Sequence, residues 1–141
     1  MPFNSLVAKV DEMTGGGHFQ EEVICQIGNG EYIPQHCEYF RFKPDLDSDI
    51  QAASLVIGHG GTGTVLGLLA ARKRFVAVVN PIGAHDHQAQ FLARLGETVS
   101  ILWTRALDEL PELVTKAREY EIQALAGMAL ADDLKVFLES P

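Results

Sequence analysis

A run of glycine and threonine residues carries the strongest chemical signal in this chain. It reads Gly58-His59-Gly60-Gly61-Thr62-Gly63-Thr64 and follows the apolar segment 54–57. Glycine lets the backbone approach a ligand closely, and a helix that begins here presents N–H groups without partners to an anion. Thr62 and Thr64 add hydroxyl donors. The run is therefore interpreted as a phosphate-binding loop.

Three phosphate ligands fit this loop to different degrees. Gly58, Gly60 and Gly63 satisfy the dinucleotide pattern G-x-G-x-x-G, but Asn80 stands where that pattern needs an acid to hold the ribose. The spacing of an ATP-binding P-loop is also present, with Thr64 in place of the required lysine. A nucleotide-sugar diphosphate is the third ligand. NAD remains a less favoured alternative to it.

The histidines offer two kinds of chemistry. His59 lies inside the loop, where a diphosphate would favour its charged form, and it would then stabilise the departing nucleotide. An orienting hydrogen bond from a neutral ring is an equal alternative. His85 and His87, with His59, also suggest a zinc site. Recognition of sugar hydroxyls by Asp86, His87 and Gln88 needs no metal, so neither a metal nor a cofactor is expected.

Composition limits the function classes. The chain has 141 residues and a net charge of −8, with 47% hydrophobic and 21% charged residues. These values indicate one globular domain, residues 1–141, and the acidic balance argues against a general nucleic-acid binder. Cys25 and Cys37 are expected to be reduced thiols. The chain has neither a signal-peptide pattern nor a spanning apolar run, so a cytoplasmic protein is expected, recruited to a membrane only through a partner.

Strand and helix patterns alternate, which predicts an α/β domain with a mostly parallel sheet and helices on both faces. Both chemical motifs follow strands, at the sheet edge where such folds bind ligands. The expected strands are 22–27, 37–42, 54–57, 75–79 and 100–103. One helix is expected to begin at Phe3, and further helices are expected over 45–53, 65–72, 87–95, 107–118 and 121–138.

Ile57 to Thr64, Phe75 to Asn80 and Asp86-His87-Gln88, in this order, resemble the C-terminal half of MurG-like glycosyltransferases. The resemblance is closer to the separate donor-binding catalytic subunits of bipartite UDP-sugar transferases. These include the subunit of the dolichol-linked GlcNAc transferase and bacterial exopolysaccharide transferase subunits. The resemblance runs from about Phe3 to Ala117, and it implies a Rossmann-like domain of the GT-B type.

The resemblance also implies roles for individual residues. His59 would be catalytic, and Gly60, Gly61, Thr62, Gly63 and Thr64 would face the diphosphate. The backbone near Phe42 and Lys43 would hold the uracil. Asp86, His87 and Gln88 would meet the sugar, with Asn80 at the end of the preceding strand, and Gly28 and Asn29 would line the cleft. The implied donor is UDP-GlcNAc or a related UDP-hexose. The implied partner is a membrane-associated subunit that binds a lipid-linked glycan acceptor and supplies the general base. Self-association stays open.

Two departures from the family pattern matter. Gly67 stands where relatives carry a ribose-binding glutamate. The family also begins with a strand and a Val-Gly-Thr-like loop, which this sequence lacks before Phe3. The first strand of such a sheet is central, so its absence predicts a shortened start, a reduced sheet or a strand donated by another chain. A non-catalytic scaffolding subunit with the same fold is the alternative function.

Overall fold

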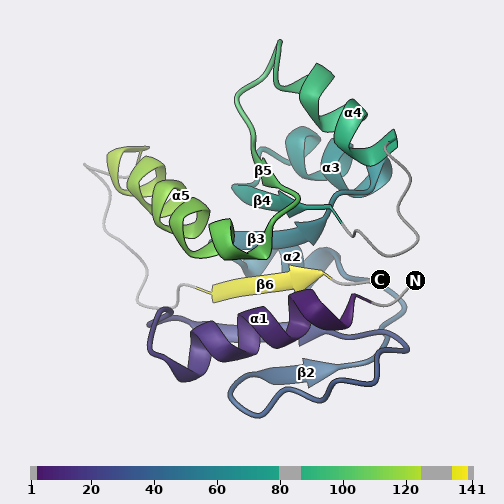
Figure 1. The fold of residues 1–141 in the computed structure, drawn as a ribbon, viewed down its shortest axis with the longest axis vertical. Helices are drawn as coiled ribbons and strands as arrows, with labels where there is room; N and C mark the ends of the chain where they lie inside the picture. Colours follow the sequence, from purple (N-terminus) through teal and green to yellow (C-terminus); the bar gives the residue numbers. More distant parts are fainter. Residues whose placement is uncertain (1–2, 80–86, 125–134, 140–141) are drawn as a thin grey trace.

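The computed structural model describes residues 3–79, 87–124 and 135–139, and in them the strands form one six-stranded sheet (Figure 1). Its order is β2-β1-β6-β3-β4-β5, and each of the five pairings is parallel. The predicted α/β, Rossmann-like class is therefore confirmed. The strands are β1 (Glu22–Gln26), β2 (Glu38–Phe40), β3 (Leu55–His59), β4 (Phe75–Val78), β5 (Leu102–Thr104) and β6 (Lys135–Glu139).

Helices cover both faces of the sheet, as predicted. On one face, the core contains buried residues of α1 (Asn4–Gly15) and α5 (Leu110–Ala124), and a 3-10 turn, η1 (Leu107–Glu109), precedes α5. The second core contains residues of α3 (Thr62–Ala70) and α4 (His87–Leu95), with Ile50 of the short α2 (Asp47–Ala52) packed against it. None of the helices in the described ranges is both long and apolar enough to cross a membrane.

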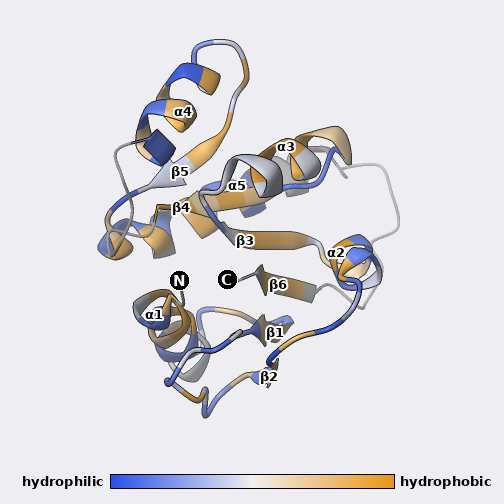
Figure 2. Ribbon diagram, turned by 90° about the vertical axis from the view of Figure 1, so that its right-hand side faces the viewer, coloured by the Kyte–Doolittle hydropathy of each residue, from blue (hydrophilic) through white to orange (hydrophobic). Residues whose placement is uncertain are grey.

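The central strands are apolar on both sides because both faces of the sheet are covered. Leu55 to Gly58 of β3 and all four residues of β4 are buried. Figure 2 shows β3 and β4 as continuously hydrophobic segments between the helical layers. Such uninterrupted apolar runs are typical of parallel strands that are buried on both faces. The sequence therefore places these two strands correctly, and the loops that follow them lie at one edge of the sheet.

The end of the chain contradicts the prediction. A helix was expected over 121–138, but α5 ends at Ala124 and residues 135–139 form β6. Val136, Phe137 and Leu138 are at most 2% exposed in the middle of the sheet. A short apolar run is compatible with a buried strand or with a buried helical segment. Residues 135–139 form a strand because their backbone pairs with β1 on one side and β3 on the other.

The strand β6 also fills the position for which no strand was expected. It pairs with β1 on one side and with β3 on the other, so these two strands do not pair directly. The expectations of a reduced sheet or of a strand from another chain are therefore wrong for this structure. The physical reason is that β1 and β3 each leave a row of backbone groups that must be paired when buried. The end of β6 and the start of α1 lie near each other (Figure 1).

Replacement of Phe137 by alanine tests the position of β6. The side chain is 2% exposed and its ring stacks on Phe40, with 6.3 Å between the ring centroids. We expect Phe137→Ala to lower the free energy of unfolding by about 3–5 kcal/mol, because it opens a cavity in the core. Tyr39→Ala is the control: Tyr39 is 44% exposed on β2, and the expected loss is below about 1 kcal/mol. Equal losses in denaturant unfolding would place β6 outside the core.

Candidate functional site

The carboxyl ends of β1 and β3 lie on either side of β6, and the edge between the loops that follow these two strands is the expected binding crevice. Gln26 of β1 and Gly58 of β3 both pair with Glu139, so they lie level with each other, two strand spacings or roughly 10 Å apart. The loop after β1 contains Gly28, and the loop after β3 contains the glycine-threonine run. The structure therefore brings two of the predicted site segments to the same edge of the sheet.

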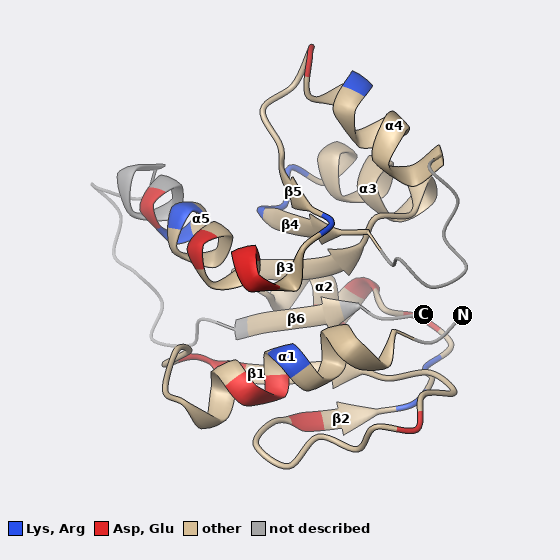
Figure 3. Cartoon of the chain, viewed as in Figure 1, with Lys and Arg blue, Asp and Glu red and all other residues tan. Residues whose placement is uncertain are grey.

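The glycine-threonine run forms the start of α3. This helix begins at Thr62, three residues before the predicted start, and its N-cap is Gly61. The amide of Val65 donates to the carbonyl of Gly61 at 3.0 Å, so the N–H groups of residues 62–64 have no acceptor within the helix. No side chain caps this end, and α3 carries no charged residue (Figure 3). The first turn therefore offers an anion three N–H groups and the positive end of the helix dipole.

The glycines of the loop have different structural roles. A Cβ on Gly61 would lie 2.6 Å from Cε1 of His59, so glycine there makes room for the imidazole ring. A Cβ on Gly60 would lie 3.2 Å from Leu92 Cδ1 and 3.3 Å from Val79 Cγ2, so this glycine lets α4 pack closely. A Cβ on Gly63 would meet no atom within 4 Å. Gly63 is therefore the position at which the first turn of α3 is open to a ligand.

His59 ends β3 with a half-buried side chain that lies under this turn. Its Nε2 is 3.3 Å from the hydroxyl oxygen of Thr64. Burial lowers the pKa of His59 below its usual value of 6.5, so the neutral ring is favoured at neutral pH in the free protein. The Thr64 hydroxyl can donate to that ring or accept from its protonated form. A bound diphosphate would act in the opposite direction to burial and favour protonation.

Two residues that sequence reasoning did not select organise the loop after β1. Arg41 Nη1 donates to the carbonyl oxygens of Gly28 and Gly30, at 3.0 Å each. Asn4 Oδ1, in the first turn of α1, accepts from the amide of Glu31 at 2.9 Å. Gly28 has a φ of 56°, which glycine adopts without strain. Arg41 directly follows β2 and Asn4 begins a helix, and these positions are the only signal in the sequence for their role.

Phe42 and Lys43 lie beyond β2 and are exposed, and Phe42 is 62% exposed. Lys43 Nζ is 3.1 Å from Asp49 Oδ1 and 4.2 Å from the centre of the Phe40 ring. The lysine side chain is therefore engaged within the protein. The resemblance implies that the backbone of this segment holds a base, and the Lys43 side chain is not needed for that role.

The predicted sugar-binding residues are described only in part. Asn80 and Asp86 lie outside the described residues, as does His85. His87 begins α4 with an exposed side chain, and Asn29, after β1, is also exposed. The side-chain oxygens of Gln88 and Gln26 are buried and have no hydrogen-bond partner among the described residues. Such an oxygen is costly to bury without a hydrogen-bond donor. Gln26 is not among the residues that the sequence predicts for the site.

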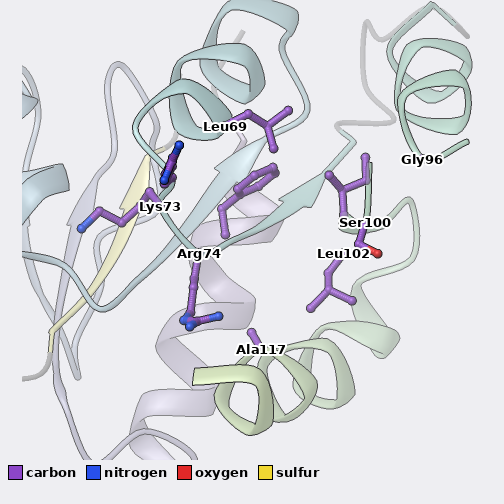
Figure 4. Close-up of a pocket in the computed structure, with 10 residues that line it drawn as sticks. Leu69, Lys73, Arg74, Gly96, Ser100, Leu102 and Ala117 are labelled. Carbon is purple, nitrogen blue, oxygen red and sulfur yellow. The ribbon is translucent and has the colours of Figure 1, made fainter. Parts of the chain in front are cut away.

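A cavity of about 570 Å³ lies at the opposite edge of the sheet (Figure 4). Phe75 and Leu102, which begin β4 and β5, line it together with Arg74 and with Ala117 of α5. The amino ends of parallel strands face away from their carboxyl ends, so this cavity is separate from the crevice. None of the predicted site residues lines it.

The half-buried ring of His59 makes the stability of the fold depend on pH. Because its pKa is lowered on folding, the unfolded chain binds the proton more readily, and stability is lost as the pH falls below about 6.5. We expect this loss, at most about 1.4 kcal/mol per pH unit, to be smaller in His59→Gln. Denaturant unfolding at about pH 7.5 and about pH 5.5 measures it. The same decrease in both proteins would contradict the buried, neutral ring.

Comparison with known proteins adds three relatives. The chain is 35% identical over 80 residues to the human UDP-N-acetylglucosamine transferase subunit ALG13. This match covers 52% of this chain and 7% of that protein. It is 35% identical over 77 residues to the ALG13 subunit of Yarrowia lipolytica, with 48% and 39% covered. It is 37% identical over 94 residues to the UDP-N-acetylglucosamine--N-acetylmuramyl-(pentapeptide) pyrophosphoryl-undecaprenol N-acetylglucosamine transferase of Solibacter usitatus, with 62% and 24% covered. No solved structure matches the chain.

The matches to these three proteins span well under half of each one's length. The match to the family is broader and extends over residues 2–136, from the start of the chain into β6. It includes the glycine-threonine loop, the crevice and both helical layers. The chain therefore belongs to the glycosyltransferase family 28 C-terminal domain.

Proposed function

We propose that this chain is the donor-binding and catalytic unit of a UDP-sugar glycosyltransferase. The observation that carries the proposal is the first turn of α3, which has three N–H groups without helical acceptors, an open position at Gly63 and the His59 ring beneath it. The family to which the chain belongs supports it, as do the names of the relatives, which are UDP-N-acetylglucosamine transferases or their subunits. We take UDP-GlcNAc or a related UDP-hexose as the donor.

In the proposed reaction an acceptor hydroxyl attacks the anomeric carbon of the sugar. The bond from that carbon to the diphosphate oxygen breaks, and negative charge develops on the departing UDP. The first turn of α3 faces this charge with N–H groups already in place, which is the arrangement that stabilises a developing anion. His59 is neutral before binding, and the diphosphate raises its pKa, so the ring takes up a proton where the charge develops. A general base must remove the proton of the acceptor hydroxyl.

The sugar would lie between the two loops of the crevice. The buried oxygens of Gln88 and Gln26 have no partner among the described residues, and sugar hydroxyls are donors of the right kind. His87, at the start of α4, is close in sequence to Gln88 and joins this group in the proposal. Asp86 and Asn80 stay predictions from the resemblance.

We further propose that a membrane-associated partner binds a lipid-linked glycan acceptor and supplies the general base. Two relatives are named as subunits, and another is named for an undecaprenol-linked substrate. The test is reconstitution of the chain with a candidate partner in vesicles that contain the acceptor lipid. Transfer must require both proteins. Full activity of the partner alone would make this chain a scaffolding subunit.

Titration calorimetry with UDP tests the donor site directly. We expect the chain to bind UDP in preference to ATP and NAD, and we expect Gly63→Leu to reduce UDP affinity at least tenfold, because the side chain would cover the N–H groups. Ala70→Leu introduces the same side chain at an exposed position at the far end of α3 and should leave binding unaltered. Wild-type affinity in Gly63→Leu would reject the phosphate-loop assignment, and preferential binding of NAD would replace the donor.

Gly67 provides a gain-of-function test. It lies one turn after Gly63, and a Cβ there would meet no atom within 4 Å, so a longer side chain has space. The resemblance puts a ribose-binding glutamate at this position. We expect Gly67→Glu to raise UDP affinity roughly tenfold, with a smaller gain for deoxyuridine diphosphate, which lacks one ribose hydroxyl. Gly67→Ala controls for the better helix propensity of a non-glycine residue. Equal affinities in the two variants would place the ribose elsewhere.

A further inference from the structure

Two thiols that the proposed chemistry does not use lie close together, one in β1 and one just before β2. Cys25 is in β1 and is fully buried, and Cys37 directly precedes β2 and is half-buried. Both are free, and their sulfur atoms are 3.6 Å apart, with Cys25 as the hydrogen-bond donor. A disulfide has its sulfurs about 2 Å apart, so an approach of roughly 1.5 Å would allow the bond to form.

A buried carboxylate holds Cys37 in this position. Asp11 of α1 accepts hydrogen bonds from the hydroxyl of Tyr32 at 2.6 Å, from the amide of Gln35 at 3.0 Å and from the amide of His36 at 2.7 Å. Its Oδ1 is also 3.6 Å from the sulfur of Cys37. Burial alone would raise the pKa of Asp11, but these bonds outweigh it and lower the pKa. The carboxylate thus fixes the segment before β2 against α1.

The two thiols differ in the way that an attacking and a resolving cysteine differ. The hydrogen bond from Cys25 lowers the pKa of Cys37, because it stabilises the thiolate. The same bond, together with burial, raises the pKa of Cys25. Cys37 is also the more exposed of the two. A reagent from solution therefore meets the more acidic thiol first.

We propose that Cys25 and Cys37 form a reversible redox pair that is oxidised by low-molecular-weight disulfides. The Cys37 thiolate attacks one sulfur of the reagent, the sulfur–sulfur bond of the reagent breaks, and one thiolate leaves and takes a proton. Cys25 then attacks the Cys37 sulfur of the mixed disulfide. The second thiolate leaves and takes the proton that Cys25 loses. Two protein thiols are oxidised to one disulfide, and the reagent is reduced to two thiols.

The bond would link β1 directly to the segment that enters β2. The same two strands lead to Gly28, after β1, and to Arg41, after β2. The side chain of Arg41 already donates a hydrogen bond to the carbonyl of Gly28. Oxidation would therefore add a covalent connection on the amino-terminal side of that contact. The inference concerns this pair alone and does not depend on the proposed transferase reaction.

The experiment is oxidation of the folded chain by glutathione disulfide at neutral pH, followed by intact mass and peptide mapping. We expect the loss of two hydrogens per chain, one cross-linked peptide that contains Cys25 and Cys37, and full reversal by dithiothreitol. Circular dichroism before and after oxidation shows whether the fold is retained. Two free thiols after prolonged incubation, or a bond that forms only in denaturant, would overturn the proposal.

Single variants separate the two roles. Cys25→Ala removes the resolving thiol, so a mixed disulfide with glutathione should accumulate at Cys37. Cys37→Ser should leave Cys25 unmodified, because that thiol is buried. If Cys25→Ala fails to fold, the time course of the wild type decides instead: a transient mixed disulfide must map to Cys37. A mixed disulfide on Cys25, or one that persists in the wild type, would contradict the assignment.

Discussion

The pairing of β6 between β1 and β3 is the interaction on which the rest of the structure depends. It joins β2-β1 on one side to β3-β4-β5 on the other, and its residues Val136 to Leu138 contribute to both cores. It also fixes the level of Gln26 relative to Gly58, and hence the position of the two loops at the carboxyl edge. Because buried backbone groups must be paired, this one segment joins the two halves of the sheet and sets the spacing between the two loops.

The chemistry proposed for the edge of the sheet depends on two opposing electrostatic effects on His59. Burial disfavours the imidazolium ion, and the lowered pKa keeps the ring neutral in the free protein. An anion at the first turn of α3 would favour the charged form and would also receive the N–H groups of that turn. The site thus needs no permanent positive side chain, which agrees with an α3 that has no charged residue (Figure 3). The charge would appear only with the ligand.

Polar contacts organise the loops on the β1–β2 side of the sheet. Asp11 of α1 accepts hydrogen bonds from the segment 32–37 and so holds it against that helix. Arg41, after β2, donates to two carbonyls of the loop after β1. Asn4 holds the next residues of that loop. The cysteine pair lies within the same set of contacts, between Asp11 and β1. This side therefore combines the placement of the crevice loop with a position at which a covalent bond can form.

The sequence alone determined the elements whose signals are local. The apolar runs at 54–57 and 75–79 predicted two buried strands, and α4 has the bounds that its pattern indicated. Both predictions succeed because an apolar run and a helical periodicity can be recognised from neighbouring residues in the sequence. The glycine-threonine run predicted an anion-binding helix start for the same reason, although α3 begins three residues earlier than expected.

The tertiary structure alone decided the rest. Residues 135–139 became a central strand because β1 and β3 left an unpaired position between them. Arg41 and Asn4 took their places through hydrogen bonds to residues distant along the chain, Gln26 was buried by the fold, and the protonation state of His59 depends on how deeply the fold buries it. None of these is a property of a local window, since each requires the neighbours that only folding supplies.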